Sequence, residues 1–137
     1  MKFGRDFYLI GTLSVIGIIL IFALSWQTDS NLKSFPFMPA WIYDWADTRR
    51  FHKIRTAVPF VVLSLLIGIW FCKINASIYQ FIATWIILTG VVVLAEFGQY
   101  FIPTRYVEPK DIFWGAAGSF LGLASTYILL RFLRFFR

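Results

Sequence analysis

The chain has 137 residues, enough for one domain, and its formal net charge is +6. Hydrophobic residues make up 59% of it and charged residues only 15%, and the mean hydropathy is +0.72. Soluble domains carry nearer to about a quarter charged residues, so this composition excludes an ordinary soluble domain. The basic residues follow and precede apolar runs and form no single patch, which argues against nucleic acid and favours anionic membrane lipids as partners.

The first apolar run, residues 6–26, predicts a membrane span because its length matches the ~20 residues needed to cross a bilayer. Lys2 and Arg5 precede the run, so a secretory signal peptide is the alternative. The apolar stretch is longer than the ~7–15 residues of a signal-peptide core. We therefore expect a retained signal-anchor helix.

The segment that follows, residues 30–55, is too apolar for a solvated loop. Pro36 and Pro39 keep its first part out of a helix, and a short helix is expected from Ala40 onward. Because Trp and Tyr prefer the headgroup level, we expect this loop to lie along the membrane interface and partly to roof the helices. It is either an aromatic anchor or one wall of a site for a lipid or partner. The interface residues expected here are Phe35, Phe37, Trp41 and Trp45.

Three further apolar runs predict spans over residues 56–72, 77–101 and 111–132. Asp111 stands where a helix N-cap belongs, and its charge suits the positive end of that helix. The expected fold is an all-α membrane protein. It comprises one polytopic domain over residues 1–137, a bundle of four transmembrane helices with an aromatic interfacial loop between the first two.

Four spans place both termini on the same side of the membrane. Basic residues are nearly balanced between the two sides, so the first span has to decide the orientation. Lys2 and Arg5 precede that span and Asp29 follows it. We expect both termini in the cytoplasm.

Small residues predict the faces through which the helices pack. The spacing Gly118-xxx-Gly122 is the pattern that lets two membrane helices approach closely. Such a face serves packing within the bundle or contact with another membrane protein, and both interpretations stay open. The glycines expected at packing faces are Gly11, Gly17, Gly115, Gly118 and Gly122.

Polar side chains gather where the third span ends and the fourth begins. Glu96 and Gln99 are three residues apart and share a helix face, with Glu96 just below the interface. A carboxylate there needs a proton or a partner. Arg105 could hold it with two hydrogen bonds, and Asp111 is close enough in sequence to share that guanidinium. We expect one cluster of Glu96, Gln99, Arg105 and Asp111 at one membrane face.

This pattern resembles the VanZ-like family of small bacterial membrane proteins. The resemblance covers about the last third of the chain: Glu96-xx-Gln99-x-Phe101-x-Pro103-x-Arg105, then Asp111, then Gly118-xxx-Gly122. The chain departs from the family in the stretch DTRRFH, residues 47–52, and at Gly115, where the family tends to carry Asn. The resemblance implies a multi-pass protein of the bacterial cytoplasmic membrane with a role at the cell envelope, since the family's namesake is associated with glycopeptide resistance.

The residues that could carry catalysis are few. His52 and Cys72 lie in no motif with metal-ligand spacing, so no metal and no cofactor are expected. His52 could ligate a haem or pigment, although such a residue is more often a polar interface group. Glu96, Arg105 and Asp111 are the catalytic candidates, acting on a lipid headgroup with Arg105 on phosphate and Glu96 as acid or base.

The sequence therefore predicts two alternative functions. The first is a non-catalytic accessory or assembly subunit that binds another integral membrane protein. The second is a cell-envelope protein that handles a lipid or lipid-linked headgroup. Whether the chain is an enzyme stays open, with the non-catalytic interpretation favoured.

Overall fold

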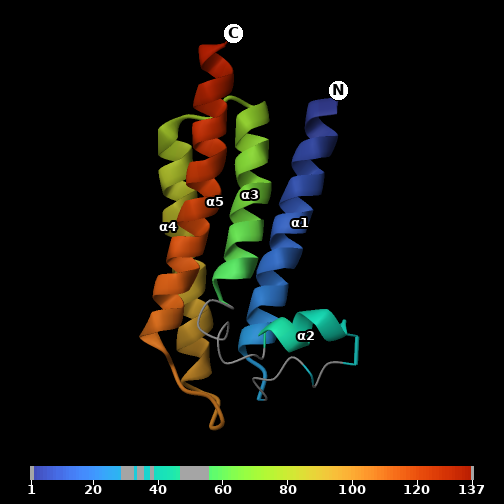
Figure 1. Cartoon of the computed structure of the whole chain (residues 1–137), viewed down its shortest axis with the longest axis vertical. Helices are drawn as coiled ribbons and strands as arrows, with labels where there is room; N and C mark the ends of the chain where they lie inside the picture. Colours follow the sequence, from blue (N-terminus) through green and yellow to red (C-terminus); the bar gives the residue numbers. More distant parts are fainter. Residues whose placement is uncertain (1, 29–32, 34–35, 38, 47–55, 137) are drawn as a thin grey trace.

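A computed structural model describes residues 2–28, 33, 36–37, 39–46 and 56–136, and this part of the chain is helical with no strand. Figure 1 shows long helices running side by side and one short helix lying across their lower end. In chain order the helices are α1 (Lys2–Ser25), α2 (Ala40–Ala46), α3 (Ala57–Lys73), α4 (Ile78–Gln99) and α5 (Pro109–Phe135).

The long helices alternate in direction. α1 begins and α5 ends at the same end of the molecule, here called the terminal end, while α4 ends and α5 begins at the opposite end, here called the loop end (Figure 1). At the terminal end, Lys73 of α3 forms an ion pair with Asp6 of α1, with an Nζ to Oδ2 distance of 3.2 Å. Asn75, with φ of 53°, allows the tight turn into α4.

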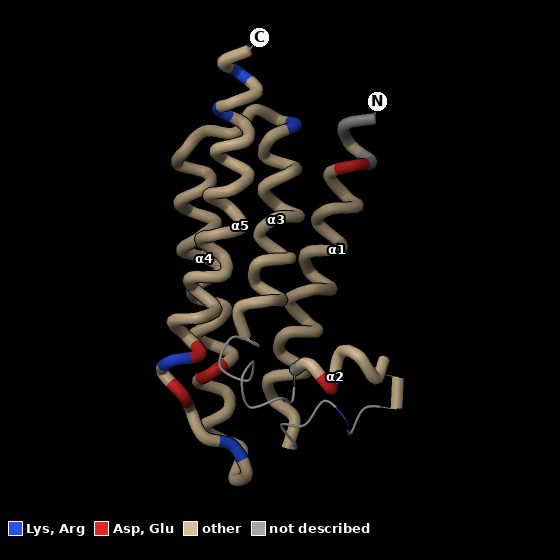
Figure 2. The backbone as a smooth tube through the Cα atoms, in the orientation of Figure 1, with Lys and Arg blue, Asp and Glu red and all other residues tan. Residues whose placement is uncertain are grey.

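Three helices are long and apolar enough to cross a membrane: their candidate spans are Asp6–Ser25, Ile78–Gln99 and Pro109–Phe135. α3 is also apolar but has 17 residues, about 26 Å of helix. Among the described residues, Lys, Arg, Asp and Glu stand toward the two ends of these helices, and the middle of the helices carries none (Figure 2). The expectation of an all-helical chain with apolar spans is confirmed for these three helices, which fits a membrane protein.

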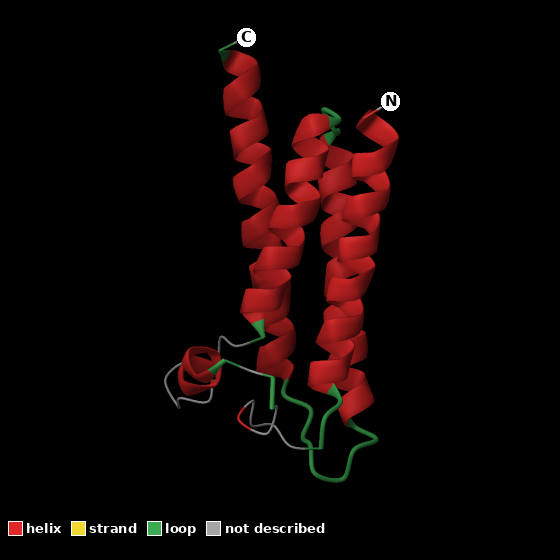
Figure 3. Cartoon of the chain, turned by 90° about the vertical axis from the view of Figure 1, so that its right-hand side faces the viewer, coloured by secondary structure: helices red, strands yellow, loops and turns green. Residues whose placement is uncertain are grey.

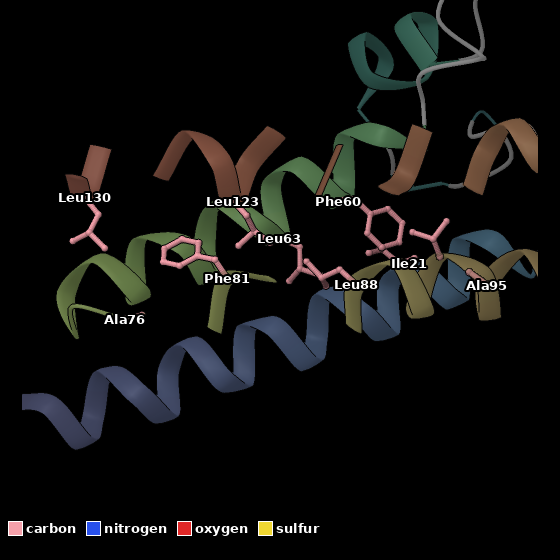
Figure 4. Close-up of a cluster of buried hydrophobic side chains, with 10 residues drawn as sticks. Ile21, Phe60, Leu63, Ala76, Phe81, Leu88, Ala95, Leu123 and Leu130 are labelled. Carbon is pink, nitrogen blue, oxygen red and sulfur yellow. The ribbon is translucent and has the colours of Figure 1, made fainter. Parts of the chain in front are cut away.

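The core lies between α3, α4 and α5, and α5 packs most closely against α3 and next against α4 (Figure 4). Phe60 and Leu88 are each only 1% exposed. α1 contributes less, with Ile21 as its buried hydrophobic residue. The remaining core residues shown in Figure 4 include Leu63, Ala76, Phe81, Ala95, Leu123 and Leu130.

Small residues on α5 bring its backbone against α3. A β-carbon on Gly118 would lie 2.5 Å from the carbonyl oxygen of Ala57, and one on Gly122 would collide with the Ser64 hydroxyl. Thr126 continues this row, since its side chain fills the space that a β-carbon on Gly68 of α3 would need. The residues of this row on α5 recur every four positions, the spacing that keeps them on one helix face.

The other glycines expected to pack are placed differently. Gly115 faces α4, where a β-carbon would lie 2.7 Å from Val92. Gly17 of α1 faces Leu63, with a corresponding distance of 3.4 Å. Gly11 has no atom within 4 Å of the position that its β-carbon would take. Only the last of these lies on a surface that the described chain leaves open.

The helix expected after Ala40 is present as α2, which lies across the loop end, away from the bundle axis (Figures 1 and 3). Trp41 is exposed and Trp45 half-buried. Phe37, just before α2, is 95% exposed. Phe35 and residues 47–55, which include His52 and the DTRRFH stretch, lie outside the described residues.

Candidate functional site

The centre of the candidate site is the last turn of α4, where two polar side chains are buried. Glu96 is 3% exposed and Gln99 is 4% exposed. Their spacing of three residues puts them on one helix face, and the Gln99 amide nitrogen donates a hydrogen bond to Glu96 Oε1 at 3.1 Å. The three-residue spacing of Glu96 and Gln99 in the sequence had predicted that these side chains lie together.

A second donor to Glu96 comes from the start of α5. The backbone N–H of Glu108 points to Glu96 Oε2, with an N to O distance of 3.5 Å. Glu108 is the residue directly before Pro109, the first residue of α5. Backbone N–H groups at this position have no partner within the helix, and they lie at the positive end of its dipole. The Glu96 carboxylate therefore lies at the positive N-terminal end of α5, which stabilises a negative charge.

α1 is the third helix that reaches this site. Gln99 donates a second hydrogen bond to Ser25 Oγ at 2.8 Å, and Ser25 Oγ donates to the carbonyl of Ala95 at 3.3 Å. Trp26 donates from its indole nitrogen to the same carbonyl at 3.0 Å. We call this set of residues the polar junction: Ser25, Trp26, Glu96, Gln99 and Glu108.

The indole of Trp26 fits against α4 because residue 98 is glycine. A β-carbon on Gly98 would overlap the Trp26 ring. A fourth contact lies beside the junction: Thr104 Oγ1, in the loop between α4 and α5, donates to the carbonyl of Thr28 at 2.8 Å. The end of α1 is thus held to α4 and to the following loop by several polar contacts.

Arg105 and Asp111 contribute to this site through their charges. Both interact electrostatically with Glu96. The two-pronged hydrogen bond expected from Arg105 is replaced: within the described residues, the donors that reach the Glu96 carboxylate are Gln99 and Glu108. Gln99 lies one turn away on the same helix, so its contact requires no ordering of a loop, whereas Arg105 projects from the loop itself.

Ser25, Trp26 and Glu108 were not among the site residues predicted from the sequence. One signal was available for the first two: the first apolar run ends with Ser25 and Trp26 at the same membrane face as the third run, which ends near Gln99. A Trp at that depth needs an acceptor for its N–H. For Glu108 the side chain carries no signal, because its backbone N–H makes the contact.

The geometry of the junction restricts its chemistry. A general acid or base must come within hydrogen-bond reach of a substrate, but the Glu96 carboxylate is almost fully enclosed and its partners belong to the chain. Among the described residues, no three His, Cys, Asp or Glu side chains gather as a metal site would require. Cys72 lies at the α3–α5 contact, with Sγ 3.2 Å from the carbonyl of Thr126. The hydrogen bonds of the polar junction connect the end of α1, the end of α4 and the start of α5.

Comparison of the chain with protein-family models, with curated proteins and with solved structures gives no match. The resemblance to the VanZ-like family consequently stays a prediction that rests on the residues quoted above.

Proposed function

We propose that this protein is a non-catalytic accessory or assembly subunit of a larger membrane protein complex, built on a VanZ-like scaffold in the bacterial cytoplasmic membrane. The observation that carries the proposal is the outer surface of α1. Only 6% of its apolar window is buried within the chain, compared with 22% for α4 and 33% for α5. α1 therefore offers the largest unoccupied helix surface among the three.

Lipid alone can cover an apolar helix, so a protein partner on α1 has to be argued from a feature that lipid does not need. Gly11 is such a feature. Membrane helices associate through small residues that permit close backbone approach. Gly17, on the same helix, already faces Leu63, whereas Gly11 meets no other part of the described chain within 4 Å. A transmembrane helix of another protein is the occupant that such an open glycine suits.

The polar junction supports a non-catalytic role. A subunit needs Glu96 only for folding, while an enzyme needs it exposed to a cavity. The carboxylate is 3% exposed and is held by Gln99 and Glu108. Breaking such a buried network is costly, which accounts for the presence of a carboxylate at this depth without assigning it a reaction.

We further propose that α3 is the fourth span and that both termini are cytoplasmic. α1 and α4 run from the terminal end to the loop end, so the chain has to return between them, and α3 is the helix that does so (Figure 1). Its length of about 26 Å is slightly less than the ~30 Å hydrocarbon core. Lys73 at its end can extend its charged group to the headgroups.

The alternative is a cell-envelope protein that handles a lipid or lipid-linked headgroup. Arg105 favours it: this side chain is half-buried near Glu96, and no hydrogen bond from it reaches the carboxylate. A phosphate could be its ligand, with Asp111 nearby. The enclosure of Glu96 argues for the first proposal.

Purification from native membranes in mild detergent, followed by mass spectrometry of the co-purifying proteins and lipids, tests the two proposals. We expect a membrane protein in stoichiometric amount with the wild-type chain. Gly11→Leu should reduce its recovery at least severalfold, because the larger side chain holds the partner helix away. Gly90→Leu is the matched control, since a β-carbon on Gly90 of α4 would also have no neighbouring atom within 4 Å.

Loss of the partner with Gly90→Leu but not with Gly11→Leu would show that α1 is not the docking surface. A wild-type chain that purifies alone, carrying one specific lipid, would overturn the subunit proposal in favour of the headgroup alternative.

A further inference from the structure

A groove between α4 and α5 lies on the surface of the helices at the terminal-end half of the molecule. Its volume is about 260 Å³. Phe81 and Leu123 form its floor and are 4% and 3% exposed, while Phe120 and Ile128 stand at its sides and are 55% and 67% exposed. The groove therefore opens sideways, toward the place where lipid surrounds the two helices.

The groove follows the contact between α4 and α5, from Ile78 and Ile128, toward the terminal end, to Trp85 and Phe120. An acyl chain is unbranched, narrow and flexible, and it can enter.

The lining of the groove is apolar, and its one indole donor is already satisfied. Trp85 donates from its ring nitrogen to the carbonyl of Ala116 at 3.0 Å. Its ring meets Phe120 edge to face at 5.9 Å, and the rings of Phe81 and Tyr127 meet in the same manner at 5.2 Å. These aromatic pairs give the groove rigid walls with no unpaired indole N–H to satisfy.

A cation stands at the terminal-end mouth of this groove. The Arg131 guanidinium carbon lies 5.8 Å from the centre of the Tyr127 ring, and Tyr127 lines the groove. Arg131 is one turn beyond Tyr127 and Ile128, hence on the same face of α5. The end of α5 also carries Arg134, one turn beyond Arg131, so positive charge gathers at this end of α5 (Figure 2).

The dimensions match one leaflet of a bilayer. From Arg131 to Phe120 the axis of α5 rises about 16 Å, close to half of the ~30 Å hydrocarbon core. A phosphate placed at Arg131 would leave an acyl chain running down the groove toward Trp85. Apolar lining, length and charge thus point to the same ligand.

We propose that this groove is a binding site for one anionic phospholipid, with an acyl chain between α4 and α5 and the phosphate on Arg131. The site lies at the opposite membrane face from the polar junction and does not depend on the subunit proposal. The proposal concerns a bound lipid and not a second surface for another protein.

Native mass spectrometry of the full chain in detergent, titrated with phosphatidylglycerol and with phosphatidylcholine of identical acyl chains, tests the site. We expect one phosphatidylglycerol per chain, bound in preference to phosphatidylcholine. Arg131→Gln should weaken phosphatidylglycerol binding about fivefold, the effect of one basic residue near an anionic headgroup. Lys110→Gln is the control, since it removes the same charge from the loop end of α5, away from the groove.

A second variant tests the acyl-chain portion separately. Ala124 lines the groove, so Ala124→Leu should fill it and weaken both lipids equally. Ala83→Leu, on the exposed surface of α4 outside the groove, should leave both affinities unchanged. Equal wild-type binding of the two lipids, equal losses from Arg131→Gln and Lys110→Gln, or unchanged binding by Ala124→Leu would each overturn the proposal.

Discussion

Gln99 is the residue on which the polar junction depends most, because its amide group connects Glu96 of α4 with Ser25 of α1. One side-chain nitrogen donates both to Glu96 Oε1 and to Ser25 Oγ. Polar groups enclosed away from water are costly to leave unpaired. Removing this amide would leave a carboxylate oxygen of Glu96 and the Ser25 hydroxyl each short of a partner.

Gln99→Ala should therefore lower the free energy of unfolding by about 1–3 kcal/mol, the cost of leaving a buried polar group unsatisfied. Thermal unfolding in mild detergent, followed by tryptophan fluorescence, measures the change. Gln27→Ala is the control: it removes the same amide from a half-buried residue that makes no hydrogen bond within the described residues. Equal shifts in Tm for the two variants would show that the junction does not stabilise the fold.

At the scale of helices, α3 and α5 form the closest pair, and their contact is made by small residues. A membrane interior gives little hydrophobic gain for helix association, so close backbone packing has to supply the stability. Gly118 meets the Ala57 carbonyl directly, and a backbone atom cannot rotate aside as a side chain can. The two helices would have to separate to admit even one methyl group here.

Gly118→Ala should accordingly destabilise the protein by about 1–3 kcal/mol, as overpacking does in close-packed interiors. Gly90→Ala makes the same chemical change where nothing lies within 4 Å, and it should be neutral or stabilise α4 by up to about 1 kcal/mol. Chemical unfolding in mixed detergent micelles compares the two. A Gly118→Ala variant as stable as Gly90→Ala would contradict close α3–α5 packing.

For the whole molecule, the alternation of helix directions sets the topology. The turn between α3 and α4 and the end of α5 lie at the terminal end, while the loop between α4 and α5 lies at the loop end (Figures 1 and 3). If α4 and α5 cross the membrane, the first two sites share one side and the third lies on the other. If α3 crosses as well, the start of α1 also lies on the shared side. The proposed orientation puts the shared side in the cytoplasm.

Single cysteines in a Cys72→Ser background test this topology. Gly4→Cys, Ser77→Cys, Tyr106→Cys and Phe136→Cys occupy exposed positions at the start of α1 and in these three regions. With a membrane-impermeant maleimide, Gly4→Cys, Ser77→Cys and Phe136→Cys should react in inverted vesicles, and Tyr106→Cys only in right-side-out vesicles. If Ser77→Cys and Gly4→Cys reacted on opposite sides of the membrane, α3 would not be a span.

The sequence predicted the three helices that are long and apolar enough to cross a membrane, because hydropathy is a local property of the chain. The pairing of Glu96 with Gln99 was equally accessible, since helix geometry fixes the positions of residues three apart. The donors Ser25 and Glu108 were not, because their contacts depend on which helix ends meet. On α5, Thr126 continues the row of Gly118 and Gly122 because its side chain fills the space opposite Gly68, a contact that only the position of α3 decides.

By itself, then, the sequence determined that this chain is helical, apolar enough for a membrane, and polar where the third and fourth apolar runs meet. Each of these follows from residues that are neighbours in the chain. Tertiary structure decided that Gly118 packs inside while Gly11 stays open, and that α4 and α5 leave a groove below Arg131. Those properties arise only when helices distant in sequence come together, because each depends on what the neighbouring helix places opposite.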